Sequence, residues 1–458
     1  MKFGGTSVED SEAIIRVVEI VRSEVARKPI VVVSACAGIT NQLLKIALLS
    51  AEGKKDEAND LITATRLKHE KLVDELITSE LPKNYLKGKI SVYAHELRNF
   101  SQAISVLGEV SNRSRDAIAS YGERLSSMII AQAMEEHSIK AALVDAREYM
   151  ITDESYTRAA PLFEIVEEKT KKLLAPLAND GIVVITQGFI GASMNGITTT
   201  IGRGGSDYSA AIIGAVLDAE EIQIWTDVDG VLTADPSIVP EARRIKKMSF
   251  NEASELAYFG AKVLHPMTIL PAIEKDIPVY VRNSRNPSYH GTLISKGDNH
   301  EECVVKSIAY KERITLLNLV SSRMFMAHGF LEAVFAVFNK YNTIAHAVAT
   351  SEVSVSVAID DTTKLEAMKR EFGEFAEVTS SNGKAIVCVV GENIRYSPGI
   401  VGKIFSAMNG IRVNMISQGA SEINIGFVVD ENDLEHAVQL LHKDLFGDSR
   451  SLSSEIFD

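Results

Sequence analysis

The chain has 458 residues, which is more than one domain usually holds and predicts two or three domains. Hydrophobic residues make up 46% and charged residues 24%, the balance of an ordinary globular protein. The formal net charge of −13 at pH 7 argues against nucleic acid as a partner, and no apolar run approaches the roughly 20 residues of a membrane-spanning helix.

The first residues, MKFGGTSVEDSE, lack the apolar core of a secretory signal. The three cysteines, Cys36, Cys303 and Cys388, are scattered and lack the spacing of metal ligands. We therefore expect reduced thiols in a cytoplasm, no metal site built from protein side chains and no contact with a membrane.

The first half of the chain alternates helices with fully apolar strands. An amphipathic helix is predicted from Ala13, Ile14, Val17, Val18, Ile20 and Val21. Apolar strands are predicted at Ile30–Ala35, Ile182–Thr186, Glu221–Thr226 and Ile277–Val281, and further helices at Ser206–Leu217 and Ser249–Leu264. The charged, proline-poor stretch from 52 to about 135 has a helical period and predicts an all-helical insertion. Together these patterns predict an α/β domain with a buried parallel sheet over residues 1–297.

The last third of the chain contains an internal repeat. A shift of 70 positions aligns Gly329–Asp360 with Gly399–Asp430 without a gap. Identical residues and alternating strands superpose, and each copy has the length of a βαββαβ ferredoxin-like unit. We predict two such modules, at 298–380 and 381–458, with the last strand or helix of the second returning to the first.

The first motif with chemical meaning is KFGGTS at Lys2–Ser7, ahead of the first helix. Paired glycines let backbone N–H groups approach phosphate oxygens, and Lys2 adds a full positive charge. A glycine turn without a ligand explains GGTS as well. The motif is not a Walker A loop, and the chain has no Gly-x-Gly-x-x-Gly dinucleotide fingerprint.

The second motif, TTTIGRGGSDY at 198–208, is a glycine-rich loop that opens another helix. Arg203 offers a planar fork that matches a carboxylate or a phosphate. Asp207 can orient a lysine or accept a substrate hydrogen bond. The alternative is a helix cap formed by Ser206 and Asp207 without a ligand. Because this is the second phosphate-suited loop at a helix start in one domain, the ligand interpretation is favoured.

Three further motifs are weaker alone. Thr226 and Asp227 end an apolar strand, where ligands of open α/β sheets lie. FGAKVLHP at 259–266 carries Lys262 at a helix end, where a lone lysine is usually a solvated cap. SYGE at 120–123 places Glu123 in an otherwise apolar helix start.

The order and spacing of these motifs resemble those of one family. KFGGTS, SACAGIT, SYGE, TQGFIG, TTTIGRGGSDYSA, IWTDVDGV, FGAKVLHP and TSEVSVS fall as in the aspartate kinases. Over nearly its whole length the chain resembles the monofunctional, lysine-sensitive type of the amino-acid kinase family. The resemblance implies a three-layer α/β/α sandwich with a helical insertion, followed by two ferredoxin-like ACT domains.

The resemblance also implies a reaction. It is the transfer of the ATP γ-phosphate to the side-chain carboxylate of L-aspartate, which gives 4-phospho-L-aspartate, the first step toward lysine, threonine and methionine. Mg²⁺ would accompany ATP, held mostly by phosphates and water. An amino-acid effector, lysine or threonine, would act through the ACT domains. A homodimer through these domains is expected because ferredoxin-like modules leave sheet edges that pair with their copies.

Roles follow by resemblance. The catalytic residues would be Lys2, Asp207 and Lys262. Aspartate would be held by Ser34, Thr40, Glu123, Arg203, Gly204, Gly205 and Ser206. ATP would contact Lys2, Phe3, Gly4, Gly5, Thr226, Asp227, Leu232, Ser237, Lys262 and Val263. The effector would contact Met324, Ala327, Gly329, Phe330, Leu331, Ala345, His346, Ser351 and Glu352. Asp207 would organise the lysines, since a carboxylate nucleophile is already ionised at neutral pH and needs no base.

Three features depart from the family pattern. Relatives have a strand before KFGGTS, whereas here Lys2 follows Met1, so a short or missing first strand is expected. Leu232 and Ser237 stand where relatives often carry Tyr and Arg. His346 stands where lysine-sensitive relatives carry an Asp suited to a lysine ammonium.

Other functions fit the motifs less well. Sibling kinases of glutamate, acetylglutamate or uridylate would share the phosphate loops but not SYGE, FGAKVLHP and the ACT pair. The length and the missing dinucleotide fingerprint exclude a fusion to homoserine dehydrogenase. The alternative from another class is a catalytically impaired amino-acid sensor on a kinase scaffold.

Overall fold

The computed structural model describes residues 1–202, 204–260, 268–297, 304–321, 329–447 and 456–458. The chain packs as two compact units. The first comprises residues 1–231 with the described part of 264–296, and the second comprises the described parts of 232–263 and 297–458. Among the described residues, no helix is both long and apolar enough to cross a bilayer.

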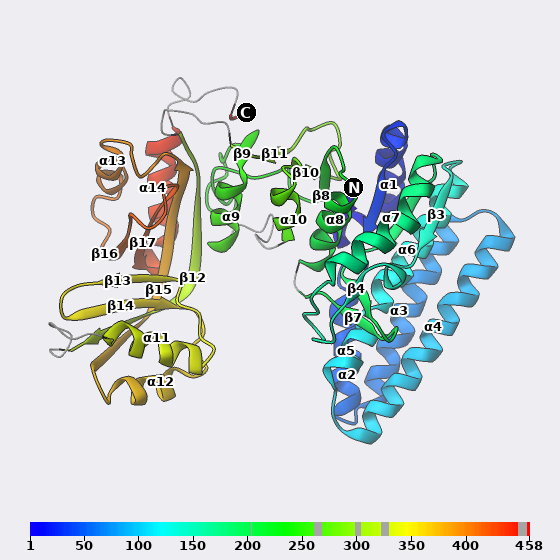
Figure 1. The fold of residues 1–458 in the computed structure, drawn as a ribbon, viewed down its shortest axis with the longest axis horizontal. Coiled ribbons are helices and arrows are strands. Elements are labelled where there is room, and N and C mark those ends of the chain that lie inside the picture. Colours follow the sequence, from blue (N-terminus) through cyan, green and yellow to red (C-terminus); the bar gives the residue numbers. More distant parts are fainter. Residues whose placement is uncertain (203, 261–267, 298–303, 322–328, 448–455) are drawn as a thin grey trace. The chain divides into compact units, whose positions relative to one another are not determined.

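A largely parallel sheet forms the centre of the first unit (Figure 1). Seven of its strands run in the order β3 (Ala141–Val144), β5 (Val183–Gln187), β2 (Ile30–Val33), β1 (Lys2–Phe3), β8 (Ile222–Thr226), β10 (Val279–Asn283) and β11 (Thr292–Ser295). All neighbours pair in parallel except β10 and β11. The expected short first strand is present: its two residues pair with β2 and with β8, so Lys2 starts the central strand.

Helices flank this sheet in two groups. The helix α1 (Ser11–Glu24) packs with α6 (Tyr121–Glu136), and α8 (Gly205–Val216) packs with α7 (Phe163–Asn179) and α10 (Leu270–Glu274). The buried residues of α1 are the six apolar residues of the predicted stripe. The Asp10 carboxylate caps this helix by accepting the Ala13 N–H at 2.8 Å. The three-layer α/β/α sandwich is thereby confirmed.

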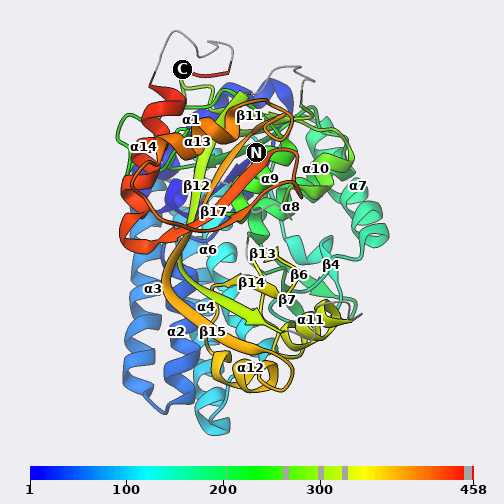
Figure 2. The same ribbon diagram turned by 90° about the vertical axis from the view of Figure 1, so that its left-hand side faces the viewer.

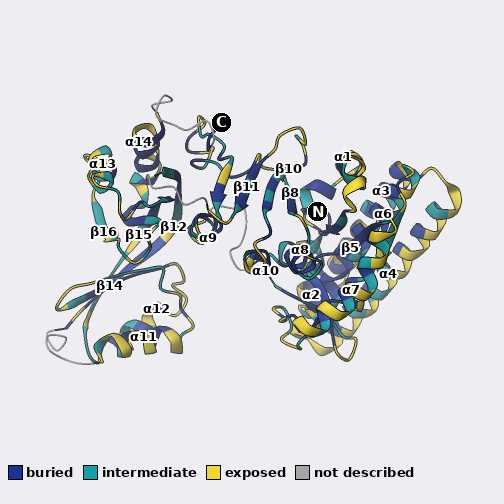
Figure 3. Ribbon diagram, turned by 45° about the horizontal axis from the view of Figure 1, so that its top comes forward, coloured by how far each residue is buried: buried dark blue, intermediate teal, exposed yellow. Residues whose placement is uncertain are grey.

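The stretch between β2 and β3 is helical apart from short connections, and it includes the all-helical insertion predicted from 52 to about 135. It contains α2 (Ile39–Ala51), α3 (Lys55–Leu76), α4 (Glu80–Leu107), α5 (Asn112–Ala119) and α6. Their apolar faces join α1 and the sheet in one core, seen as the dark interior in Figure 3. The longest helix, α4, ends at Gly108, whose φ of 71° is readily adopted by glycine.

A smaller sheet leads into the second glycine-rich loop. Its strands are β4 (Ile151–Thr152), β6 (Ile190–Ser193) and β7 (Thr198–Thr200). The buried Asp116 carboxylate of α5 holds β7 by accepting the Thr200 N–H at 2.9 Å and its hydroxyl at 2.7 Å. Gly202 and Gly204 follow with φ values of 83° and 72°, and α8 starts at Gly205.

The second unit is built on one six-stranded antiparallel sheet (Figure 2). Its strands run in the order β13 (Ala347–Thr350), β14 (Ser354–Ile359), β12 (Val304–Val320), β15 (Glu377–Glu392), β17 (Asn424–Asp430) and β16 (Val413–Ser417). The helices that follow the repeat are α11 (Phe330–Lys340), α12 (Leu365–Phe372), α13 (Ile400–Ala407) and α14 (Leu434–Phe446).

The two modules interleave along β12 and β15. Residues 314–320 of β12 pair with 377–384 of β15 and lie beside β14, which completes the first module. Residues 304–311 pair instead with 386–392, beside β17, and so serve as a strand of the second module. Sequence analysis placed 304–311 in the first module because the repeat alignment does not reach this strand. The second module is therefore discontinuous in the chain.

The helix predicted at Ser249–Leu264 is shorter than expected. It is α9 (Phe250–Tyr258), capped by reciprocal hydrogen bonds between Ser249 and Glu252. It ends where Gly260 takes a φ of 104° and where an added Cβ would lie 2.7 Å from the Tyr310 carbonyl oxygen. The Lys306 ammonium donates to the Glu252 carboxylate at 2.9 Å, a buried ion pair that ties α9 to β12.

Candidate active site

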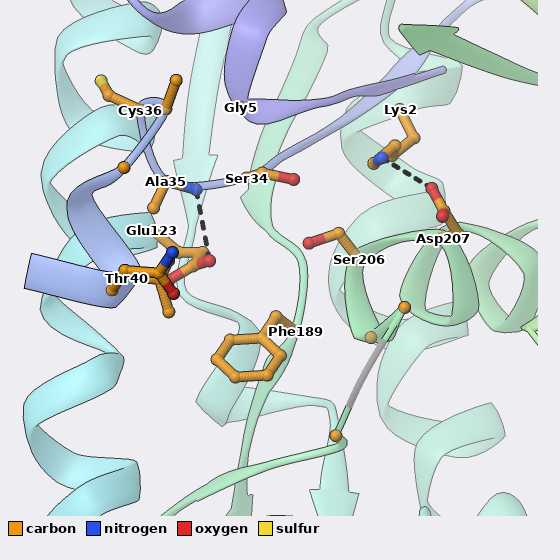
Figure 4. Close-up of a pocket in the computed structure, with 16 residues that line it drawn as sticks. Lys2, Gly5, Ser34, Ala35, Cys36, Thr40, Glu123, Phe189, Ser206 and Asp207 are labelled. Carbon is orange, nitrogen blue, oxygen red and sulfur yellow. Dashed lines mark hydrogen bonds and ion pairs between the residues drawn. The ribbon is translucent and has the colours of Figure 1, made fainter. Parts of the chain in front are cut away.

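A pocket of about 380 Å³ lies in the first unit at the carboxyl ends of β1 and β2 and the start of α8 (Figure 4). Side chains and glycines from both sequence motifs line it. The lining residues are Lys2, Gly5, Ser34, Ala35, Cys36, Ala37, Gly38, Thr40, Asn41, Glu123, Phe189, Gly202, Gly204, Gly205, Ser206 and Asp207. We call this cavity the Lys2 pocket.

One wall of the Lys2 pocket holds a buried ion pair. The Lys2 ammonium lies 2.7 Å from an Asp207 carboxylate oxygen, and both side chains are less than one-fifth exposed. Lys2 comes from the central strand, and Asp207 from the first turn of α8 (Figure 4). The carboxylate therefore holds the ammonium at the N-terminus of a helix, where backbone N–H groups already favour an anion.

Another wall carries a buried carboxyl. Glu123 of α6 is 3% exposed, and its Oε1 accepts the Ala35 N–H at 3.2 Å. Its Oε2 is buried with no hydrogen-bond partner. Burial raises the pKa of Glu123 to about 8, against a smaller lowering by the backbone hydrogen bond. Such a carboxyl is suited to receive a cationic group of a ligand, because a cation would restore its ionisation.

Glycines create the space around these groups. A Cβ on Gly5 would lie 2.9 Å from the Ala35 carbonyl oxygen, and one on Gly205 would lie 2.9 Å from the Phe189 ring. Gly188 lets Ser206 approach, since a Cβ there would lie 2.6 Å from that of Ser206. The backbone can thus come close to a phosphate at the loop before α8.

The contact between Gly122 and Ala35 gives a testable consequence for Glu123. A Cβ on Gly122 would lie 2.7 Å from the Ala35 Cβ. Gly122→Ala should therefore push Ala35 away from Glu123 and cost about 1–3 kcal/mol of unfolding free energy. Gly88→Ala, in the middle of α4 with nothing near the new Cβ, should instead add about 0.5–1 kcal/mol. Urea unfolding measures both. Equal changes in the two variants would contradict the packing argument.

Other predicted ATP residues lie beside the carboxyl end of β8. The Thr226 hydroxyl lies 3.2 Å from the Asp227 carboxylate. The Thr226 carbonyl accepts from the Ser284 N–H at 2.8 Å, and the Ser284 hydroxyl meets that of Ser7 at 2.8 Å. Gly4 donates its N–H to the Trp225 carbonyl at 3.0 Å. The KFGGTS loop and the β8 end are thereby joined in one network.

The structure brings most predicted substrate residues together. Ser34, Thr40, Glu123, Gly204, Gly205 and Ser206 all line the Lys2 pocket with Lys2 and Asp207. Arg203, Lys262, Val263, Met324 and Ala327 lie outside the described residues. Leu232 and Ser237 belong to the second unit. There the Leu232 carbonyl accepts from Ser307 at 2.8 Å, and Ser237 donates twice to Asp235, at 2.9 Å and 2.6 Å.

Sequence reasoning missed several lining residues. Cys36, Asn41 and Phe189 were not assigned a role, although SACAGIT and TQGFIG contain Cys36 and Phe189. Phe189 is apolar and carries no chemical signal of its own, and Cys36 and Asn41 are single residues without a recognisable spacing to a partner. Ser7 and Ser284 were also missed, because their pairing joins residues far apart in the chain.

The predicted effector residues lie in the first module of the second unit. Gly329, with a φ of 87°, precedes α11, and Phe330 and Leu331 are the first two residues of this helix. Ser351 lies on the turn between β13 and β14, where its hydroxyl meets that of Ser354 at 2.7 Å. Ala345 packs at the edge of the module core, and Glu352 is exposed.

The His346 side chain is almost fully buried in a polar cluster. Its Nε2 lies 3.0 Å from the Lys311 ammonium and 2.9 Å from an Asp360 carboxylate oxygen, and its Nδ1 lies 3.2 Å from the Tyr258 hydroxyl. Burial opposes ionisation of Asp360, but hydrogen bonds from Lys311 and His346 outweigh it and lower the pKa of Asp360 to about 2. The Lys311 ammonium, paired with Asp360 at 2.7 Å, therefore lies beside His346 as a cation of the protein itself.

Comparison with known proteins agrees with this architecture. The model of the amino acid kinase family matches residues 1–283, and an ACT domain model matches residues 387–445. Fold and pocket thus define an amino acid kinase with ACT modules.

Individual relatives specify the branch. The chain is 37% identical to lysine-sensitive aspartokinase 3 of Escherichia coli, covering 97% of this chain and 98% of that protein. It is also 37% identical to the chloroplastic aspartokinase 1 of Arabidopsis thaliana, covering 97% and 80%. The crystal structure of E. coli aspartokinase III with aspartate and ADP in the R-state superposes with a TM-score of 0.84 at 35% identity, covering 97% and 99%. The chain belongs to the aspartokinase family.

Proposed function

We propose that the Lys2 pocket binds L-aspartate and the phosphates of ATP and transfers the γ-phosphate to the aspartate side-chain carboxylate. A carboxylate oxygen forms the new P–O bond, the bond to the β,γ-bridging oxygen breaks, and 4-phospho-L-aspartate and ADP leave. The observation that carries this proposal is the placement of the Lys2–Asp207 pair and the buried Glu123 around one cavity. The E. coli relative crystallised with aspartate and ADP supports it.

The pocket supplies both charges that the substrates require. Glu123, with one oxygen unpartnered, is placed to receive the α-ammonium of aspartate. The Lys2 ammonium and the N–H groups at the start of α8 are placed to stabilise negative charge on the transferred phosphoryl group. Asp207 then positions Lys2, and no general base is needed because the attacking carboxylate is ionised.

The phosphate groups fit the residues present. The close approach at Gly5 and the left-handed Gly204 ahead of α8 form a backbone surface open to an anion. Among the described residues, no cluster of three or more His, Cys, Asp or Glu side chains could hold a metal ion. Mg²⁺ would accompany ATP, bound mainly to its phosphates and to water, where it neutralises charge.

Substrate choice tests the proposal directly. ADP release should be fast with aspartate and at least tenfold slower with glutamate, acetylglutamate or uridylate offered at equal concentration. A preference for any of these three would assign the chain to a sibling kinase. Absence of ADP release with every acceptor would favour the alternative of an impaired amino-acid sensor, which the relatives above do not support.

The effector site is proposed in the first module, around Gly329, His346 and Ser351. The E. coli relative crystallised with lysine and aspartate in the T-state supports lysine as the effector class. Here His346 offers no carboxylate to a lysine ammonium, and the nearby Asp360 carboxylate is already paired with Lys311 at 2.7 Å and with His346 at 2.9 Å. Loss of a charge-assisted hydrogen bond costs about 1.5–3 kcal/mol, a roughly ten- to hundredfold weaker affinity.

Lysine should therefore inhibit weakly, or a neutral amino acid such as threonine should replace it. His346→Asp should strengthen lysine inhibition by about tenfold or more, because the new carboxylate can pair with the side-chain ammonium of the lysine effector. Inhibition curves for lysine, threonine and methionine on both proteins measure this. Tight inhibition of the unmodified chain by lysine would refute the argument from His346.

We further propose a cytoplasmic homodimer that forms through the ACT modules. Strands β13 and β16 are the end strands of the six-stranded sheet, and ferredoxin-like modules associate through such edges and the faces beside them. Light scattering at micromolar concentration should give twice the chain mass of 49.9 kDa. A monodisperse monomer would contradict this.

A further inference from the structure

The first unit contains a second cavity, of about 580 Å³, that no part of the proposed reaction uses. Its lining residues come mainly from α4, α5, α6 and the start of β7. Glu123 and Arg124 are consecutive in α6, and the first lines the Lys2 pocket while the second lines this cavity. We call it the Arg124 cavity.

Arg124 lies over two aromatic rings, beside the Tyr121 hydroxyl and within the electrostatic influence of Asp145. Its guanidinium lies over the Tyr93 and Tyr121 rings, 4.4 Å and 4.6 Å from their centroids. None of the ion pairs between described side chains includes Arg124. Its Nε is buried and has no hydrogen-bond partner. The rings cover the face of the guanidinium, so its N–H edge remains the part that can bind a planar anion.

The other arginine of the cavity is not available in this way. Arg147 makes two hydrogen bonds to Asp145, from its Nε at 2.9 Å and from an Nη at 2.6 Å. Another Nη donates weakly to the Thr198 hydroxyl at 3.4 Å. Arg147 is thus neutralised by its own carboxylate, and Arg124 carries the remaining positive charge.

A carboxylate faces the same cavity without neutralising Arg124. One oxygen of Glu96 accepts the Tyr121 hydroxyl at 2.6 Å, and Glu96 forms no ion pair with any described cation. Two oppositely charged groups therefore line one cavity while each keeps a free side. The rings of Phe100 and Tyr121, which contact each other edge to face, supply an apolar wall of the cavity.

We propose that the Arg124 cavity binds a free α-amino acid, with its carboxylate on Arg124 and its ammonium on Glu96. A zwitterion matches a site with one unpaired cation and one unpaired carboxylate, whereas a dicarboxylate or a diamine leaves one of them unmatched. An arginine fork and a carboxylate are the groups that recognise these two ends. This site lies in the kinase unit and is separate from the effector residues of the second unit.

Two elements connect the Arg124 cavity to the Lys2 pocket. The helix α6 carries both Arg124, which lines the Arg124 cavity, and Glu123, which lines the Lys2 pocket. Strand β7 starts at Thr198 in the cavity and leads through Thr200, held by Asp116, to Gly202 and Gly204 of the pocket. An occupant would therefore act on the groups proposed to hold aspartate, and its effect should appear in the KM for aspartate.

Calorimetric titration of the full chain tests the proposal. The probes are the L-amino acids other than aspartate, each paired with the carboxylic acid that lacks its α-amino group, in the presence of saturating ADP. At least one amino acid should bind, and its desamino partner should bind at least tenfold more weakly. Arg124→Lys, which keeps the charge over the rings but loses the fork, should weaken binding at least tenfold.

Glu96→Gln should weaken binding of the amino acid at least tenfold and leave its desamino partner unaffected. Arg113→Gln, an exposed change on α5 outside the cavity, should alter neither. Thermal melting shows which variants fold. If Arg124→Lys does not fold, the binding measurements on Glu96→Gln alone test the proposal. Equal affinity for both partners overturns the proposal. So does binding that responds to His346→Asp but to neither cavity variant, because it then reports the effector residues.

Discussion

Replacing Lys2 with methionine is expected to lower kcat by about a hundredfold or more, with a smaller change in the KM for aspartate. Lys2 is the first residue of the central strand. Its side chain is buried, and its ammonium is fixed by the Asp207 carboxylate at 2.7 Å. It is therefore preorganised for charge that develops on the phosphoryl group, and such an interaction stabilises the transition state more than the substrates. Lys45→Met, an exposed change on α2, is the matched control and should leave kcat unchanged.

Asp207→Asn should produce a loss of similar size, because the amide no longer holds the ammonium. The double variant should then lose little more than either single one, since both changes remove the same arrangement. Steady-state ADP release gives all four values. A near-normal kcat in Lys2→Met would remove this residue from the catalytic group, and additive losses would show that Asp207 acts independently of Lys2.

The second large effect concerns Glu123 and pH. Burial raises its pKa to about 8, so the carboxyl is mostly protonated near neutrality before aspartate binds. If the ionised form receives the substrate ammonium, kcat/KM for aspartate should rise about tenfold per pH unit up to about pH 8 and then level. In Glu123→Gln this rise should disappear. The two proteins should therefore be similar at pH 6 and differ by tenfold or more at pH 9.

Stability should respond to the same group in the opposite sense. Because the folded pKa exceeds the unfolded one of 4.5, the unfolded chain loses this proton first. The contribution of Glu123 to stability is full below about pH 4.5 and is lost as the pH rises to about 8. Glu123→Gln should therefore be more stable than the parent at pH 8 but not at pH 4.5. Glu19→Gln, on the surface of α1, should show no such difference. Identical pH profiles in parent and Glu123→Gln would show that Glu123 does not titrate in this range.

Much of the first unit could be predicted from periodicity. The buried stripe of α1 was predicted residue by residue, and the four apolar strands lie within two residues of the expected positions at each end. These elements are buried on whole faces, so their apolar pattern carries the signal. The end of α9 could not be predicted in this way. It is set by the approach of Gly260 to Tyr310, a contact between residues that only folding brings together.

The candidate site likewise combines residues that the sequence could single out with contacts that it could not predict. Lys2, Glu123 and Asp207 could be singled out because glycine-rich loops and charged residues in apolar surroundings are visible in a sequence. Their meeting in one pocket depends on β1 lying between β2 and β8, which sequence spacing does not specify. The pairing of Lys311 with His346 was not foreseen either, because it joins strand β12 to the residue before β13.

The strand formed by residues 304–311 has a consequence for how the chain reaches its native state during synthesis. The first module, residues 314–384, emerges as a block and can close its own four strands. The preceding strand must wait for 386–392, and its neighbour β17 arrives later still. During this interval Val304, Val305, Ile308 and Ala309 present an unpaired edge, the kind of surface on which nascent chains aggregate. Shielding of this edge by a chaperone should matter most between the synthesis of residue 311 and that of residue 392.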